Sequence, residues 1–91
     1  MARIEKTLPI VNKLGLHARA AIKLVQLTSS YHGTVTVSNG EKEASAESVM
    51  GLLMLEAAQG QTIRVTCEGD DAAALMDAVE QLVAARFDES E

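Results

Sequence analysis

Hydrophobic side chains recur along this chain with two different periods, and the periods separate strands from helices. Apolar residues fall mainly on alternate positions at residues 3–11, 34–38 and 61–68, as in strands that bury one face. Pro9 cannot donate a hydrogen bond to a neighbouring strand, so it indicates an edge strand or a strand end. Alternation alone therefore predicts three strands.

A fourth strand follows from a turn signal. Asn39 and Gly40 are adjacent, and both tolerate the positive φ angles of a type I′ turn. They predict a hairpin that joins the strand at residues 34–38 to a short return strand at residues 41–46.

Three other stretches have helical spacing, and the first and the third show the pattern of a helix that buries one face. They are residues 18–30, residues 49–58 after an N-cap at Ser48, and residues 72–86 after an acidic N-cap at Asp71. The first helix is expected to bury Ala18, Ala21, Ile22, Leu24, Val25, Leu27 and Thr28, and the third Leu75, Met76, Val79, Leu82 and Val83. A charged tail follows the third helix.

The predicted element order is β-α-β-β-α-β-α, which is an α+β arrangement. Four strands that each have one apolar face favour a four-stranded antiparallel sheet with three helices on one face, an open-faced sandwich. At 91 residues and 47% hydrophobic composition, the chain is expected to form one domain, residues 1–91, with a modest core. The lone Cys67 is expected to act as a small core hydrophobe.

Composition and charge exclude several classes of function. No run is apolar enough to cross a bilayer or to form a signal peptide, so we expect a cytoplasmic protein without a membrane partner. A formal net charge of −5 argues against nucleic acid as a partner, because that binding needs many Lys and Arg residues. His32 has no Cys or acidic neighbour, so we predict a surface histidine and no metal site.

The charges are unevenly placed. Basic residues Lys6, Lys13, Arg19 and Lys23 fall in the first quarter, and acidic residues Asp70, Asp71, Asp77, Glu80, Asp88, Glu89 and Glu91 crowd the last. One interpretation is a basic edge that meets acidic partners. The other is an acidic tail that is merely solvated.

His17 is the strongest candidate for chemistry. It follows Gly15 and lies at or next to the N-cap of the first helix, where free N–H groups and the helix dipole favour an anion such as phosphate. Arg19 adds a guanidinium that suits phosphate oxygens. One imidazole nitrogen can attack phosphorus while the other donates a hydrogen bond. The alternative is a helix-initiating histidine with a solvated arginine nearby.

The second helix is apolar on nearly every side, with Val49, Met50, Leu52, Leu53, Met54 and Leu55. Complete burial is hard in so small a domain, so part of this helix is expected to form a docking surface. We assign Leu52 and Leu55 to the core.

Two segments resemble a known family. Residues 15–21, Gly-Leu-His-Ala-Arg-Ala-Ala, resemble the G-L-H-A-R-P-A signature of HPr, the histidine phosphocarrier of the bacterial phosphotransferase system. Residues 48–55 resemble the family's S-[IV]-M-G-[LV] segment, and residues 12–15, 52–55 and 87–89 look most like its nitrogen-related branch, NPr. Ala20 replaces the usual proline, and little mechanistic loss is expected because alanine is a good helix former.

The resemblance implies a phosphoryl carrier rather than a turnover enzyme. His17 would accept phosphate through Nδ1 from an enzyme I-type kinase, ultimately from phosphoenolpyruvate, and pass it to a histidine of an enzyme IIA-type protein. In the nitrogen-related branch that acceptor is regulatory. Ala18 and Arg19 would hold the phosphoryl oxygens. The implied partner surface contains Ala20, Lys23, Val49, Met50 and Leu53. No cofactor and no metal are implied, and we expect a monomer.

Ser48 allows two interpretations. In some bacteria a dedicated kinase phosphorylates the family's matching serine, which would make Ser48 a regulatory phosphosite and a serine kinase a further partner. The alternative is that Ser48 only caps a helix.

Two other functions fit parts of the sequence. One is a regulator that binds partners without phosphotransfer, although the presence of His17 argues against it. The other is an acyl carrier protein that uses Ser48, but such carriers are helical bundles and this chain has strand patterns. An enzyme is least favoured, because neither a second general acid nor a glycine-rich phosphate loop accompanies His17.

Overall fold

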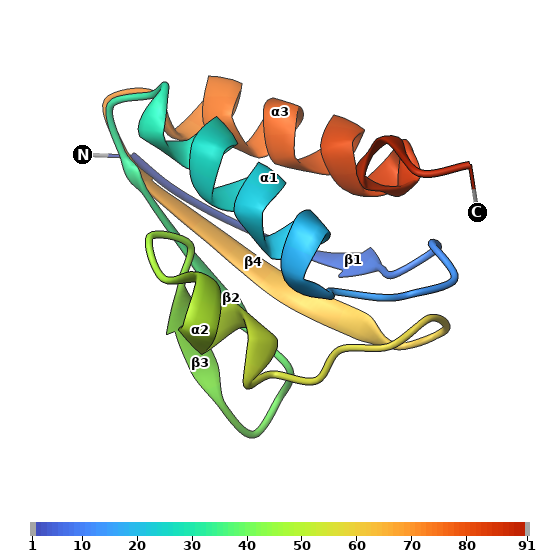
Figure 1. The fold of residues 1–91 in the computed structure, drawn as a ribbon. Helices are drawn as coiled ribbons and strands as arrows, with labels where there is room; N and C mark the ends of the chain where they lie inside the picture. The colour runs from blue at the N-terminus through green and yellow to red at the C-terminus, as the bar shows by residue number, and fades with distance from the viewer. Residues whose placement is uncertain (1, 91) are drawn as a thin grey trace.

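The computed structural model describes residues 2–90, which form one sheet with helices on one face (Figure 1). The predicted domain of residues 1–91 exceeds this range by Met1 and Glu91, which lie outside the described residues. The elements are β1 (Ala2–Pro9), α1 (Ala18–Ser29), β2 (Thr34–Ser38), β3 (Glu43–Ser45), α2 (Val49–Leu53), β4 (Thr62–Gly69), α3 (Ala72–Ala84) and a 3₁₀ turn, η1 (Arg86–Asp88). The predicted order of strands and helices is confirmed.

The sheet has the strand order β1-β4-β2-β3, and every neighbouring pair is antiparallel. β1 pairs with β4 along its whole length, from Ala2 opposite Gly69 to Pro9 opposite Thr62. Pro9 is thus the last residue of an edge strand, as predicted, where its missing N–H costs the sheet little.

The core lies between the sheet and the helices. α1 and α3 run side by side over one face, and α2 packs against β3 and α1 (Figure 1). Alternate strand residues such as Val37, Val65 and Cys67 are fully buried beneath them. Burial raises the pKa of the Cys67 thiol to about 11, so the thiol stays protonated and packs as an apolar group. Within residues 2–90 no helix is long and apolar enough to cross a membrane.

The hairpin after β2 is present, but its predicted turn type is wrong. Four residues, 39–42, join the strands, and only Gly40 takes a positive φ, of 96°. The Asn39 side chain makes the turn instead, because its Oδ1 accepts the N–H groups of Glu41 and Lys42, each at 2.8 Å. The longer loop leaves β3 with three residues, fewer than predicted.

α2 ends five residues earlier than predicted. The N–H groups of Leu55 and Glu56 bond three residues back, as in a tightening last turn, and Glu56 then takes a φ of 50°. The chain turns here because the carbonyl of Ala57 accepts the N–H of Leu16 at 2.9 Å. A long-range contact therefore replaces the helix that local spacing favoured.

Two helix details also differ from the prediction. In α1, Ala18 and Ile22 are exposed and Ala20 is buried, so the buried face is rotated from the one expected. At α3, Asp71 occupies the N-cap position without a side-chain cap bond. Its carboxylate accepts the N–H of His32 at 2.7 Å, which ties the start of the helix to the loop before β2.

The segment after α3 is charged, as predicted, but it folds back on the protein. Arg86, Phe87 and Asp88 take positive φ angles of 60°, 53° and 64°. Such angles are unfavourable for residues other than glycine. They are retained here because the Phe87 side chain is fully buried in the core. The turn brings the next residues back over the start of α1.

Candidate functional site

His17 occupies the N-cap of α1 with extended backbone angles, φ −84° and ψ −177°. Its carbonyl accepts the N–H of Ala21 at 2.9 Å, while its imidazole makes no capping bond to the helix. The side chain is 27% exposed. The backbone therefore fixes the residue at the helix start and leaves the imidazole for other contacts.

The loop before His17 is fixed by two backbone contacts. The N–H of Gly15 donates to the carbonyl of Asn12 at 3.2 Å, and the N–H of Leu16 donates to Ala57 at 2.9 Å. Gly15 takes a φ of 67° and packs directly on the Ala57 backbone. This close approach explains why a glycine precedes the histidine.

Replacing Gly15 by alanine should therefore destabilise the protein by about 2–3 kcal/mol, the sum of backbone strain and a steric clash. A Cβ at this position would lie 2.4 Å from the carbonyl oxygen of Ala57. Urea unfolding measures the loss. Gly40→Ala is the control, because Gly40 has a φ of 96° but no atom within 4 Å of an added Cβ. Equal losses in both variants would show that the contact with Ala57 is unimportant.

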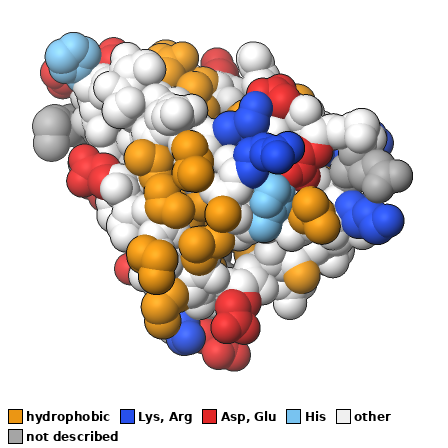
Figure 2. Space-filling view, viewed as in Figure 1, with side chains coloured by type: hydrophobic (Ala, Val, Ile, Leu, Met, Phe, Trp, Pro, Cys, Tyr) orange, Lys and Arg blue, Asp and Glu red, His pale blue; other side chains and the backbone are white. Residues whose placement is uncertain are grey.

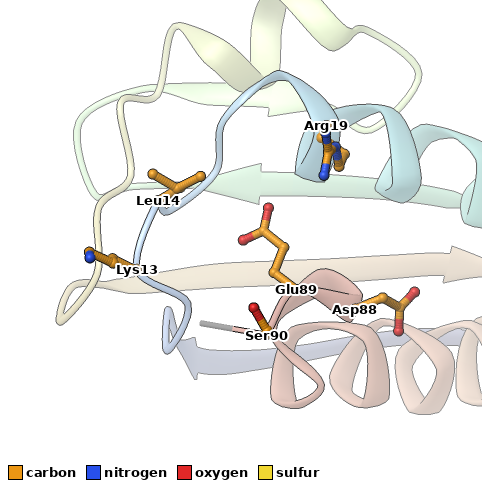
Figure 3. Close-up of a pocket in the computed structure, with 6 residues that line it drawn as sticks. All are labelled: Lys13, Leu14, Arg19, Asp88, Glu89 and Ser90. Atoms are coloured by element: carbon orange, nitrogen blue, oxygen red, sulfur yellow. The ribbon is translucent and has the colours of Figure 1, made fainter.

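The start of α1 offers an anion site next to His17. The N–H groups of Ala18, Arg19 and Ala20 belong to the first helical turn, where no intrahelical acceptor exists. The guanidinium of Arg19 makes no hydrogen bond within the described part of the chain. Figure 3 shows Arg19 at the helix start, with Lys13 and Leu14 across the same pocket. The predicted phosphate-binding residues are thus brought together.

Glu89 is a site residue that sequence reasoning missed. Its Oε2 is hydrogen-bonded to Nε2 of His17, and its Oε1 accepts the side-chain N–H of Asn12 at 2.9 Å. In Figure 3 its carboxylate points from the tail toward the start of α1. The side chain is only 12% exposed. The sequence led us to expect that one imidazole nitrogen donates a hydrogen bond, but it did not identify Glu89 as the acceptor.

The pKa of Glu89 reflects this environment. Burial acts to raise it, but the hydrogen bonds from Asn12 and His17, with the charges of His17 and Arg19, lower it overall. The carboxyl group is therefore ionised at neutral pH, and both of its oxygens act only as acceptors.

This pKa makes part of the stability pH-dependent. Folding lowers the pKa of Glu89 below the usual value of about 4.3, so the unfolded chain binds this proton more readily. The stabilisation is complete above the unfolded pKa and is lost as pH falls through the folded pKa. Urea unfolding at several pH values should show wild type more stable than Glu89→Gln near pH 7, with the difference shrinking as pH falls below about 4.3.

The neighbouring carboxylate supplies the control for that measurement. Asp88 pairs with Lys23 at 3.1 Å, but its side chain is 62% exposed, so solvent screens the pair. Asp88→Asn should alter stability little at any pH. A difference between wild type and Glu89→Gln that stays constant from pH 7 to pH 3 would contradict the assignment.

Asn12 links the loop before His17 to Glu89. It is fully buried, and its amide nitrogen donates to the carbonyl of Gly15 at 2.8 Å as well as to Glu89. Its Oδ1 has no hydrogen-bond partner among the described residues. The two acceptors on the nitrogen side therefore set the orientation of the amide.

The acidic tail meets the basic edge of its own chain. Glu89 bonds to His17, and Asp88 pairs with Lys23. The tail is therefore not merely solvated.

An exposed apolar patch lies beside the histidine. It is formed by Val49, Met50, Leu53 and Met54 of α2 and its C-cap, with Met50 68% and Met54 58% exposed. Figure 2 shows hydrophobic side chains gathered on this face next to a histidine and a basic cluster. We call these four residues the apolar patch.

The patch differs from the predicted partner surface at Ala20, Lys23 and Met54. Lys23 is not apolar and pairs with Asp88. Ala20 is fully buried, so it contributes to the core and cannot meet a partner directly. Met54 was not assigned to the surface, although it lies four residues after Met50 and so on the same helical face. The predicted core positions Leu52 and Leu55 are buried.

Ser48 caps α2, and its Oγ accepts the N–H of Gly51 at 2.9 Å. The capping interpretation is confirmed, whereas phosphorylation of Ser48 stays a prediction. His32 is exposed, as predicted. Residues 2–90 contain no group of three or more His, Cys, Asp or Glu residues arranged to hold a metal ion.

Known proteins share both the sequence and the fold. A family model described as "PTS HPr component phosphorylation site" matches residues 4–85. A phosphocarrier protein NPr from Shewanella violacea is 52% identical over 90 residues, 99% of this chain and 99% of the relative. A phosphocarrier protein HPr from Xylella fastidiosa is 44% identical over 86 residues, 94% of this chain and 97% of the relative. A solved structure, HPr-C-His from Thermoanaerobacter tengcongensis, has a TM-score of 0.90 and 35% identity, and the match covers 97% of this chain and 99% of that chain.

Proposed function

Because this chain belongs to the HPr family of phosphotransferase-system phosphocarriers, we propose that His17 is the residue that carries the phosphoryl group. One observation supports this most strongly. The imidazole lies at the N-terminus of α1 beside Arg19, and its Nδ1 has no hydrogen-bond partner within residues 2–90. A nucleophile and an anion site thus occur together.

The transfer follows from this arrangement. The lone pair of His17 Nδ1 forms the new bond to phosphorus, and the bond between phosphorus and the donor breaks with its electron pair going to the donor. The phosphoryl oxygens spread their charge in a metaphosphate-like transition state. The N–H groups of Ala18 and Arg19 and the guanidinium of Arg19 stabilise that charge. A nucleophilic histidine of the acceptor then attacks the same phosphorus.

The partners proposed for these two steps are an enzyme I-type donor and an enzyme IIA-type acceptor. Both must reach His17, so both must use the face that carries the apolar patch. Met50 supplies an exposed apolar anchor, and the basic residues nearby supply long-range attraction to an acidic protein.

Replacing Met50 by glutamate should weaken binding to both partners by about tenfold or more, because it places a charge where apolar surface is buried. Isothermal titration calorimetry with the enzyme IIA-type protein measures the affinity. Gln59→Glu is the control, since Gln59 is exposed outside the apolar patch. Unchanged affinity of Met50→Glu would remove the patch from the partner surface.

We further propose that the chain acts in the regulatory, nitrogen-related branch. The 52% identical relative named NPr supports this choice, as do residues 12–15 and 87–89. The predicted oligomeric state is a monomer, and this stays a prediction.

The experiment that tests this function uses the enzyme I-type proteins of both branches, each with phosphoenolpyruvate. We expect the nitrogen-branch donor to phosphorylate the chain, and to do so faster than the sugar-branch donor at equal concentration. Faster phosphorylation by the sugar-branch donor would place the chain in the other branch. No phosphorylation by either donor would favour a regulator that binds partners without phosphotransfer.

A further inference from the structure

We infer that Glu89 is a positioning residue for His17, whose hydrogen bond to Nε2 makes Nδ1 the nitrogen that attacks phosphorus. This inference rests on the proposed function of His17 and deepens it. It assigns a role in phosphoryl transfer to a residue of the chain's C-terminal turn.

The contact between Glu89 and His17 determines which imidazole nitrogen carries the hydrogen. An ionised carboxylate can only accept, so the bond between Glu89 Oε2 and His17 Nε2 requires a hydrogen on Nε2. In a neutral imidazole the other nitrogen, Nδ1, then carries the lone pair. The contact therefore selects one of the two tautomers.

A positioning contact is useful only if the carboxylate is itself held in place. Glu89 Oε1 accepts from Asn12, which is fully buried and also bonded to Gly15, so both carboxylate oxygens are engaged from the loop and the helix start. The carboxylate therefore cannot rotate away without losing two hydrogen bonds.

The turn after α3 also holds the backbone of Glu89 in place. Phe87, two residues before Glu89, is fully buried. Asp88, which lies between them, pairs with Lys23 of α1. The guanidinium of Arg86 donates to the carbonyl of Ser90 at 3.3 Å. These contacts bracket Glu89 on both sides, so its place over His17 is a consequence of the folded tail.

When Nδ1 bonds to phosphorus, the ring keeps its hydrogen on Nε2 and gains positive character. The Glu89 carboxylate stabilises that charge, and the proton stays on Nε2 throughout. No further reactant is required, because the donor retains the electron pair of the bond that breaks. The same contact remains when the phosphoryl group moves on.

The test combines a spectroscopic and a kinetic measurement on the full chain. Long-range ¹H–¹⁵N correlation spectra of the unphosphorylated protein show which nitrogen of neutral His17 carries the hydrogen. Wild type should show the Nε2–H form, and Glu89→Gln should show a mixture of both forms. At saturating enzyme I-type donor, Glu89→Gln should be phosphorylated roughly 10- to 100-fold more slowly, the usual loss when a partner that orients an imidazole is removed. The donor KM should stay unchanged.

The control is Glu80→Gln, which removes the same charge from α3, where Glu80 pairs with Lys6 at 2.6 Å. Its tautomer and its rate should match wild type. Faster phosphorylation of Glu89→Gln would show that the carboxylate blocks the site, and an unchanged tautomer with an unchanged rate would show that it does nothing there. If wild type itself accepts no phosphate, the proposed function fails, and the spectra still report the tautomer separately.

Discussion

Replacing His17 by alanine should abolish phosphoryl acceptance and leave the fold intact. Its imidazole makes no capping bond to α1, and its described side-chain hydrogen bond is the one to Glu89. The loss of stability should therefore be about 1.5–3 kcal/mol, that of a single hydrogen bond to a charged group. Incubation with the enzyme I-type donor, followed by intact-mass measurement, tests acceptance, and urea unfolding tests stability.

The matched control is His32→Ala, because His32 is exposed in the loop before β2 and lies outside the candidate site. It should accept phosphate as wild type does. Phosphorylation of His17→Ala at the wild-type rate would show that His17 is not the residue that carries the phosphoryl group.

Replacing Phe87 by alanine should have the largest effect on stability. The side chain is fully buried, and removal of a buried phenylalanine costs about 3–5 kcal/mol. Without this anchor, the unfavourable positive φ angles of residues 86–88 lose their compensation, and the turn should open. Urea unfolding measures the first effect, and the ¹⁵N signals of His17 report the second through loss of the Glu89 contact.

Leu82→Ala separates the two effects. Leu82 is a partly buried residue of α3 that packs against the core, so its removal should cost about 1–2 kcal/mol without releasing the turn. Its His17 signals should match those of wild type. If Phe87→Ala leaves these signals unchanged, the turn is held by something other than Phe87.

The strands and helices could be predicted because their signals are local. A two-residue or 3.6-residue period needs no knowledge of distant residues, and Val37 and Val65 follow it well. The hairpin was predicted for the same reason. Its turn type was wrong because the Asn39 side chain replaced backbone geometry with its own hydrogen bonds.

The early end of α2 depends on distant parts of the chain. Local spacing favoured a helix to about residue 58, but the Ala57 carbonyl bonds to Leu16, more than forty residues earlier. The burial of Ala20 likewise depends on how α1 packs on the sheet and α3. Periodicity identifies a helix better than it fixes the rotation of that helix.

Sequence spacing identified some of the residues that the structure places around His17, but not Glu89. His17 and Arg19 lie two residues apart at a predicted helix start, so local spacing identified them as candidates. Glu89 lies 72 residues after His17, in a stretch without periodicity, and reaches it only because three non-glycine residues turn the chain back. One signal was available: Phe87, the only phenylalanine of the chain, stands alone among charged residues and so marks a buried anchor.

The acidic residues after α3 make contacts within their own chain. Their carboxylates engage Lys23 and His17 of the same chain, at the edge that we propose as the partner surface. The turn at residues 86–88 holds these carboxylates in place. The same turn thus links stability, measured through Phe87, to the chemistry expected at His17.

Mapping the phosphoryl group on the wild-type chain tests the central claim most directly. The protein is incubated with phosphoenolpyruvate and an enzyme I-type donor, and intact-mass, acid-lability and peptide mapping follow. The account predicts a single acid-labile phosphoryl group, located on His17. An acid-stable group, a group on another residue, or no phosphorylation by either donor would contradict it.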